Sequence, residues 1–78
     1  KLDFEIFPNP NQGEFILKTI KTNSDISVEI SDINGKLIYN ETRSGLENNL
    51  QISNIQRGVY FIKVSSNNDN VIKRFVVQ

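Results

Sequence analysis

The chain has 78 residues and a mass of 8.9 kDa, which is enough for one domain with a small core. Nine basic and nine acidic side chains give a formal net charge of zero, so no long-range attraction to nucleic acid or an anionic membrane is expected. The absence of histidine and cysteine excludes thiolate metal sites, imidazole catalysis, disulfides and triads built on either residue. We therefore expect a protein that is not an enzyme, with no catalytic, cofactor-binding or metal-binding residues.

Composition and spacing both favour β-structure. Eleven isoleucines, six valines and seven aromatic residues suit strands, whereas alanine and methionine, two good helix formers, are absent. Short apolar segments recur about every 8–12 residues and are separated by residues typical of turns. No apolar run approaches the roughly 18 residues that cross a membrane, so membrane insertion is not expected.

The first two predicted strands lie on either side of a proline-containing segment. Phe4–Phe7 is short and stops at Pro8-Asn9-Pro10, where each proline favours extended geometry at the preceding residue and lacks a backbone donor. This segment is expected to be an ordered edge or loop. Gly13 then turns the chain into a strand over residues 14–20.

A β-hairpin is predicted next. Apolar and polar residues alternate over residues 26–31, which is the pattern of a half-buried strand. Asn34-Gly35 favours a two-residue type I′ turn, because both positions of that turn need a positive φ. The returning strand spans residues 36–41, and Asp32 lies just before the turn.

The second half of the chain completes an all-β pattern. The remaining predicted elements are a polar loop at residues 42–49, a short strand marked by Leu50 and Ile52, a strand at 59–65, a loop at 66–70 and a strand at 71–77. Seven short strands and no helix predict a seven-stranded antiparallel β-sandwich of the immunoglobulin-like type, because two sheets can then bury one face each.

Residues 55–60, with the sequence IQRGVY, resemble a tyrosine corner at the start of the penultimate strand. In that arrangement the tyrosine hydroxyl bonds a backbone group upstream and fixes the crossover between the sheets. We expect Tyr60 to be buried with its hydroxyl bonded, next to Gly58.

Four patterns suggest other chemistry, and each has a simpler structural explanation. Residues 57–64 partly match the strand motif of RNA-recognition domains, but two valines stand where stacking aromatics are needed. Residues 67–70, Asp32 and Asn34 offer oxygen ligands for Ca²⁺, although turn chemistry explains them better. Residues 40–42 match an N-glycosylation acceptor, which matters only in a eukaryotic secretory route. Five glutamates could pair as acid and base, but they are expected on solvent faces and loops: Glu5, Glu14, Glu29, Glu41 and Glu47.

Four other segments share their order and spacing with one known family. Residues 7–13 have the sequence FPNPNQG, residues 28–38 VEISDINGKLI, residues 55–64 IQRGVYFIKV and residues 73–78 KRFVVQ. These resemble the (Y/F)PNP…G, v.i.D.nGk.v, l..GvYfvkv and kk.vv. segments of the type A C-terminal sorting domain of proteins exported by the type IX secretion system of Bacteroidota-type bacteria. The resemblance covers residues 6–78.

The resemblance implies that residues 1–78 form a single C-terminal sorting domain, with residues 1–5 as the remnant of a linker to an N-terminally fused cargo protein. Such domains are recognised in the periplasm and directed through the translocon of the outer membrane. A cell-surface sortase then commonly removes them, so the cargo ends at the cell surface or outside the cell. The partners implied are components of the translocon and this sortase.

A sorting domain that one receptor recognises on many cargo proteins needs a rigid surface of constant shape, since preorganisation lowers the entropic cost of binding. The hypothesised recognition residues are Pro8, Asn9, Pro10, Gly13, Lys73, Arg74, Phe75, Val76, Val77 and Gln78. The residues expected to set the geometry are Asp32, Asn34, Gly35, Gly58 and Tyr60. An alternative explanation is that these residues recur because the fold needs them. If the last strand lies at a sheet edge, a partner or a second copy could pair with it and form a homodimer.

Two other functions remain open at this point. A carbohydrate-binding or adhesion-type accessory sandwich would need exposed Trp or Tyr for stacking, and the chain has no Trp and only two Tyr, both expected to point inward. A structural spacer between domains would require the parent sequence to continue beyond Gln78.

Overall fold

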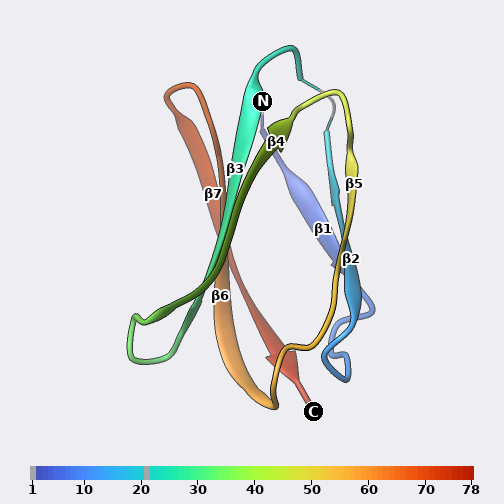
Figure 1. Cartoon of the computed structure of the whole chain (residues 1–78), viewed down its shortest axis with the longest axis vertical. Helices are drawn as coiled ribbons and strands as arrows, with labels where there is room; N and C mark the ends of the chain where they lie inside the picture. The colour runs from blue at the N-terminus through green and yellow to red at the C-terminus, as the bar shows by residue number, and fades with distance from the viewer. Residues whose placement is uncertain (1, 21) are drawn as a thin grey trace.

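The computed structural model describes residues 2–20 and 22–78, which form seven strands and two sheets. The strands are β1 Phe4–Phe7, β2 Phe15–Thr19, β3 Asp25–Asp32, β4 Leu37–Ser44, β5 Asn49–Ile52, β6 Gly58–Ser66 and β7 Asp69–Val77. The sheets have the strand orders β1-β2-β5 and β4-β3-β6-β7, and every strand pairing is antiparallel. Figure 1 shows them as two facing layers, so the predicted all-β, seven-stranded antiparallel sandwich is confirmed.

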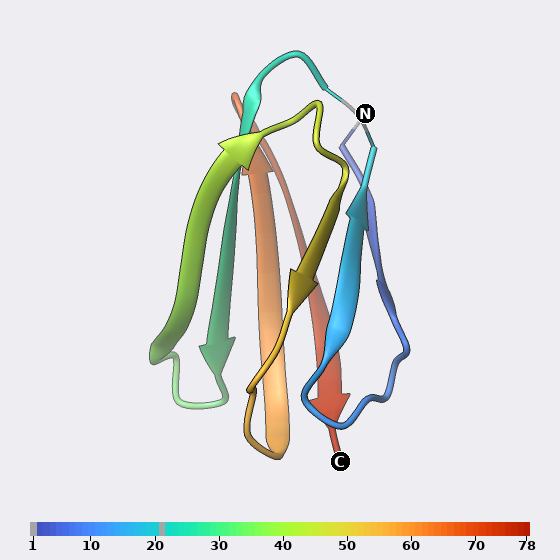
Figure 2. The same cartoon turned by 45° about the vertical axis from the view of Figure 1, so that its right-hand side comes forward.

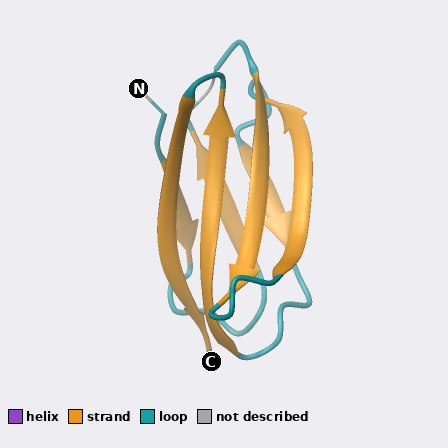
Figure 3. Cartoon of the chain, turned by 90° about the vertical axis from the view of Figure 1, so that its left-hand side faces the viewer, coloured by secondary structure: helices purple, strands orange, loops and turns teal. Residues whose placement is uncertain are grey.

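The strand order places the first strand and the last strand next to each other along one side of the sandwich. β1 is the edge of the three-stranded sheet and β7 is the edge of the four-stranded sheet. Figure 3 shows the four-stranded sheet facing the viewer, with the three-stranded sheet behind it. A side-chain hydrogen bond from Lys73 to the Phe4 carbonyl shows that β7 and β1 are in contact.

The core between the sheets is formed by alternate side chains along the strands. In β2, β3 and β6, alternate side chains point inward and are buried, while those between them face solvent. Burying one such aliphatic or aromatic side chain stabilises the fold by about 1.5–3 kcal/mol. The buried apolar residues are Leu2, Phe4, Phe15, Leu17, Ile26, Val28, Ile30, Leu50, Ile52, Tyr60, Ile62, Val64, Phe75 and Val77.

The hairpin between β3 and β4 differs from the predicted type I′ turn. Gly35 has a φ of 83°, but Asn34 does not have a positive φ, so the prediction of a two-residue turn is wrong. The Gly35 N–H donates to the Asp32 carbonyl and the Asp32 N–H to the Lys36 carbonyl, each at 3.0 Å, which makes a three-residue loop. The Asp32 carboxylate also accepts from the Asn34 and Lys36 N–H groups at 2.9 and 3.0 Å and stabilises this longer loop.

Two loop boundaries were also predicted incorrectly. Residues 42–44, expected in a loop, continue β4, because the edge strand pairs with β3 as far as Ser44. Residues 66–70 were expected to form a loop, but only Asn67 and Asn68 are unpaired. Ser66 at the end of β6 is paired with Asp69 at the start of β7. Asn67 has a φ of 55°, and Asn67 and Asn68 form a tight two-residue turn between β6 and β7.

The predicted tyrosine corner is confirmed. Tyr60 is 7% exposed, and its hydroxyl donates to the Gln56 carbonyl at 2.6 Å. The bond joins the start of β6 to the segment that arrives from β5 in the other sheet, so it fixes the crossover. Gly58 lies against the ring: a Cβ at this position would be 3.3–3.4 Å from atoms of Tyr60.

Leu2 and Phe4, near the start of the chain, belong to the folded core. Leu2 and Phe4 are 8% and 2% exposed, and the Leu2 N–H donates to the Asp69 carboxylate at 3.2 Å. Lys1 lies outside the described residues. The expectation that residues 1–5 are also the join to a cargo protein stays a prediction.

Candidate functional site

The two predicted recognition segments meet at one end of the sandwich. The Asn11 N–H donates to the Val76 carbonyl at 3.2 Å, and the Gln78 N–H donates to the Asn11 carbonyl at 2.7 Å. These bonds form a parallel bridge between Asn11 and Val77. Figure 2 shows the loop after β1 beside the end of β7, at the lower end of the molecule. We call this region, residues 8–13 together with residues 73–78, the shared end.

Asn11 also holds the loop together through its side chain. It is 3% exposed, its Nδ2 donates to the Pro8 carbonyl at 3.1 Å, and its Oδ1 accepts from the Gly13 N–H at 2.9 Å. The Phe7–Pro8 and Asn9–Pro10 peptide bonds are both cis. The sequence analysis did not select Asn11 as a site residue, although an Asn two residues before a Gly is typical of a side-chain-stabilised turn.

Gly13 anchors the loop on the segment that leads to the tyrosine corner. Its φ is 100°, and a Cβ here would lie 2.4 Å from the Ile55 carbonyl oxygen. The Ile55 N–H donates to the Gly13 carbonyl at 3.2 Å. Glycine is therefore required both by the backbone conformation and by the close approach of Ile55.

The two neighbouring basic residues of β7 have different surroundings. Lys73 points to the side of the sheet that faces the core, where Nζ donates to the Phe4 carbonyl and lies 3.2 Å from the Asp3 carboxylate. It also lies 5.0 Å from the centre of the Phe4 ring. Lys73 thus ties β7 to β1. Arg74 is exposed on the opposite side, and within residues 2–20 and 22–78 no carboxylate lies at ion-pair distance from it.

The last residues also divide between core and surface. Phe75 and Val77 are 1% and 2% exposed, and the Phe75 ring centre lies 4.9 Å from that of Phe15 and 5.6 Å from that of Tyr60. Their side chains therefore contribute to the fold. Val76 is half-buried and Gln78 is exposed.

A small groove between β1 and β7 brings together three of the predicted recognition residues. Its volume is about 230 Å³, and it is lined by Asn9, Lys73 and Arg74 together with Glu5 and Ile6. Ligand pockets for small molecules are usually about 300–1,000 Å³ and largely apolar. The groove is smaller than this range, and three charged residues contribute to its lining.

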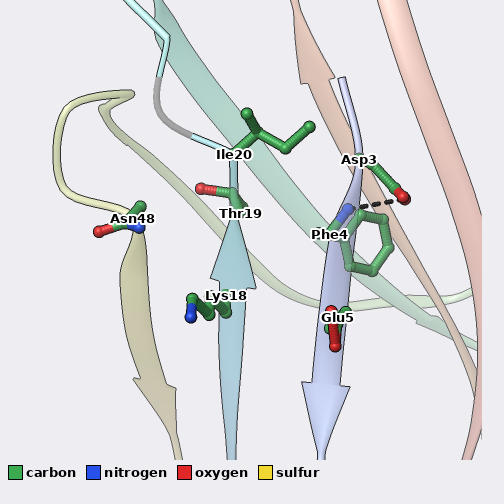
Figure 4. Close-up of a pocket in the computed structure, with 7 residues that line it drawn as sticks. All are labelled: Asp3, Phe4, Glu5, Lys18, Thr19, Ile20 and Asn48. Atoms are coloured by element: carbon green, nitrogen blue, oxygen red, sulfur yellow. Dashed lines mark hydrogen bonds between the residues drawn. The ribbon is translucent and has the colours of Figure 1, made fainter. Parts of the chain in front are cut away.

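A second recess lies at the other end of β1 and has a volume of about 290 Å³. Figure 4 shows that its side chains point in different directions rather than toward one point. The Thr19 hydroxyl is buried there without a hydrogen-bond partner among the described residues. Its lining residues are Asp3, Phe4, Glu5, Lys18, Thr19, Ile20 and Asn48.

Acidic residues are dispersed in this structure. In the part of the chain that the structure describes, no three Asp or Glu side chains gather into a group that could hold a metal ion. That part also contains no helix long and apolar enough to cross a membrane.

Residues 5–78 match the secretion system C-terminal sorting domain family. The chain belongs to this family. The resemblance seen in the sequence is therefore confirmed, and the domain is a C-terminal sorting signal for type IX secretion. A signal of this kind implies export to the cell surface or the extracellular space, and a sorting-signal domain of this fold is a non-catalytic kind of domain.

Structural similarity supports the fold independently. A DUF3244 family protein from Bacteroides vulgatus ATCC 8482, described as having an immunoglobulin-like β-sandwich fold, superposes with a TM-score of 0.75 at 17% sequence identity. The match covers 100% of this chain and 95% of that chain, which confirms the immunoglobulin-like architecture. No curated protein sequence matches the chain.

Proposed function

We propose that this domain carries an N-terminally fused cargo protein from the periplasm through the type IX translocon of the outer membrane. A cell-surface sortase then acts on the exported protein, which is attached to the surface or released. The shared end is the part that the machinery recognises. The observation that carries this proposal is that two family segments, far apart in the sequence, are joined by backbone hydrogen bonds into one surface.

The rigidity of the shared end supports a role in recognition. Asn11, Gly13 and Lys73 each hold it by contacts with other parts of the chain. A surface that is fixed before binding loses little conformational entropy on binding, so a receptor can recognise it with few contacts. Such a surface has the same shape on every cargo.

The positions of the two chain ends also support a role as a sorting signal. In Figure 1, β1 starts near the end of the sandwich opposite to the one where β7 finishes. A cargo fused before residue 1 would therefore be attached far from the shared end and leave it accessible. On this proposal residues 1–78 are the sorting domain, and the cargo joins it at residues 1–5.

The first experiment tests whether the domain directs export at all. A periplasmic reporter is fused ahead of residues 1–78 and expressed in a bacterium with a type IX system and in an otherwise identical strain without the translocon. We expect the reporter outside the cells of the first strain only. Retention in the periplasm of both strains, or release from both, would contradict the proposal.

Deletion of residues 73–78 is a poor test of recognition in this domain. It would remove Phe75 and Val77 from the core, where each is almost completely buried. Loss of export could then come from loss of the fold, since truncating one such side chain costs about 2–5 kcal/mol. Substitutions of exposed residues separate recognition from folding.

A further inference from the structure

The solvent side of β6 and β7 carries exposed apolar side chains. Side chains on the solvent side of β6 and β7 form directly opposed pairs, and these include Val59 with Val76 and Phe61 with Arg74. Phe61 is 40% exposed and Ile72, opposite Lys63, is 58% exposed. Val59 and Val76 are half-buried. We call the surface made by Val59, Phe61, Ile72, Arg74 and Val76 the β6–β7 face.

The same side of the sheet is polar on the neighbouring strand β3. On the neighbouring strand β3 the outward residues are Ser27, Glu29 and Ser31. Figure 3 shows this side of the four-stranded sheet in full. The solvent side of an antiparallel sheet normally carries polar residues, so the exposed apolar side chains of the β6–β7 face indicate a surface that a partner covers.

The charges on this side leave one cation unneutralised. Lys63 forms an ion pair with Glu29 at 3.9 Å. Arg74 lies between Ile72 and Val76 on its own strand and opposite Phe61, and no carboxylate among the described residues pairs with it. A guanidinium surrounded by apolar groups is complementary to a carboxylate with apolar neighbours.

Lys73 explains why Arg74 holds this position. Because successive side chains of a strand point to opposite sides, the bonds of Lys73 to Phe4 and Asp3 fix the opposite orientation for Arg74. Lys73 is a positioning residue, and Arg74 is the basic residue available to a partner.

We propose that the β6–β7 face docks a protein of the export machinery that presents a carboxylate among apolar side chains. This inference rests on the proposed function and extends the recognised surface from Arg74 and Val76 of the shared end to the neighbouring residues of β6 and β7. A membrane surface fits less well, because attraction to anionic lipid comes from clusters of about 4–8 basic residues. The solvent side of β6 and β7 carries two basic residues, Arg74 and Lys63, and Lys63 is already paired with Glu29.

The test uses the same reporter fusion and substitutions on the β6–β7 face. Arg74→Glu and the double variant Phe61→Thr/Ile72→Thr should each lower the secreted fraction about tenfold, as expected for residues central to an interface. Arg74→Lys should keep most of the export because it keeps the charge. Matched controls on the outer side of the three-stranded sheet are Lys18→Glu and Ile16→Thr, which should export normally.

The outcomes separate this inference from the proposed function. Thermal unfolding of each purified domain must first show a midpoint close to that of the wild type. If the wild type is exported and folded face variants are exported as well as the controls, the docking surface is wrong and the export function stands. If the wild type itself is not exported, both proposals fail. Binding of the wild type to phosphatidylglycerol vesicles that is lost in Arg74→Glu would overturn a protein partner in favour of a lipid surface.

Discussion

The two edges of the four-stranded sheet are built differently. At β7 a distant segment covers the end of the edge: Asn11 pairs with the backbone of the last residues, and the Lys73 side chain joins the strand to β1. At β4, the opposite edge, Tyr39, Glu41 and Arg43 point to the core side of the sheet, since they lie opposite buried residues of β3.

The polar side chains of β4 form a connected group. The Tyr39 hydroxyl donates to a Glu41 carboxylate oxygen, and Arg43 lies 3.5 Å from Glu41 and 3.6 Å from Glu47. Burial and the Glu41 carboxylate raise the pKa of Tyr39 to about 12. Inward-pointing charges at a sheet edge disfavour pairing with another chain.

The comparison shows two ways to protect an edge strand: pairing with a distant segment, as at Val77, and charged side chains on the core side, as at β4. The β7 edge is held by contacts distant in sequence, whereas the β4 edge relies on neighbours along one strand. The predicted homodimer through an edge strand stays a prediction, and at the four-stranded sheet it has to overcome one of these two protections. If the comparison is right, substitutions at the β7 edge cost more stability than those at the β4 edge.

The largest effect is expected for Gly13→Ala. The new Cβ would meet the Ile55 carbonyl at 2.4 Å at a φ of 100°, so we expect a loss of about 3 kcal/mol in the free energy of unfolding. Gly35→Ala is the matched control, with a φ of 83° and no atom within 4 Å of the Cβ, and should cost about 1 kcal/mol. Urea denaturation measures both; equal losses would show that the contact with Ile55 is unimportant.

Asn11→Ala should come next. It removes the bonds to Pro8 and Gly13 from a buried position, and we expect a loss of about 2 kcal/mol. Faster hydrogen exchange of the Gln78 N–H should accompany this loss, because that group donates to the Asn11 carbonyl. Asn40→Ala on β4, where the residue is exposed, serves as the control and should change neither quantity. Unchanged exchange at Gln78 would mean that the loop does not hold the last strand.

Lys73→Met keeps the length of the side chain but removes its charge and donor. The Phe4 carbonyl and Asp3 then lose a partner, and we expect a loss of about 1 kcal/mol because the side chain is partly exposed. Arg74→Met, one residue further along, should cost less than about 0.5 kcal/mol. Chemical denaturation measures both losses. A larger loss for Arg74→Met than for Lys73→Met would contradict the structural role of Lys73 and the exposed position of Arg74.

The smallest effect at neutral pH is expected for Tyr39→Phe at the β4 edge, no more than about 1 kcal/mol. The dependence of the free energy of unfolding on pH shows whether this contribution comes from Tyr39. The Tyr39 pKa is about 12 in the fold against about 10 in the unfolded chain, so the neutral form stabilises the fold below pH 10. This contribution is lost between pH 10 and 12. The Tyr39→Phe variant should lack this part of the decline in stability at high pH. It should also lack the tyrosinate absorbance that the wild type gains with a midpoint near pH 12. A wild-type midpoint near pH 10 for Tyr39 would contradict the role of burial and Glu41.

The sequence predicted the strands of the core because period-2 alternation is a direct signature of one buried face, as in β3 and β6. It failed at residues 42–44 because an edge strand with polar residues on both sides carries no such signature. It also failed at the Asn34-Gly35 turn, where the Asp32 carboxylate favours a longer loop.

The shared end was only partly predictable. Alternation with the buried Phe75 and Val77 could have placed Lys73 on the core side and Arg74 outside. The bridge between Asn11 and Val77 could not be predicted, because a single pairing between distant segments leaves no periodic pattern in a sequence. Its only local sign was the Asn11 turn itself.

The most direct test of the account is to block each end of the sandwich in turn and measure the secreted fraction of the reporter fusion. A small folded domain is inserted either after Gln12, in the shared end, or between Asn67 and Asn68, in the turn at the opposite end in Figure 1. Because the insertion after Gln12 separates Asn11 from Gly13, thermal unfolding must first show that both inserted proteins fold. The account predicts that the insertion after Gln12 abolishes export and the insertion at Asn67 leaves it nearly unchanged. Equal export from both, or loss only with the insertion at Asn67, would contradict it.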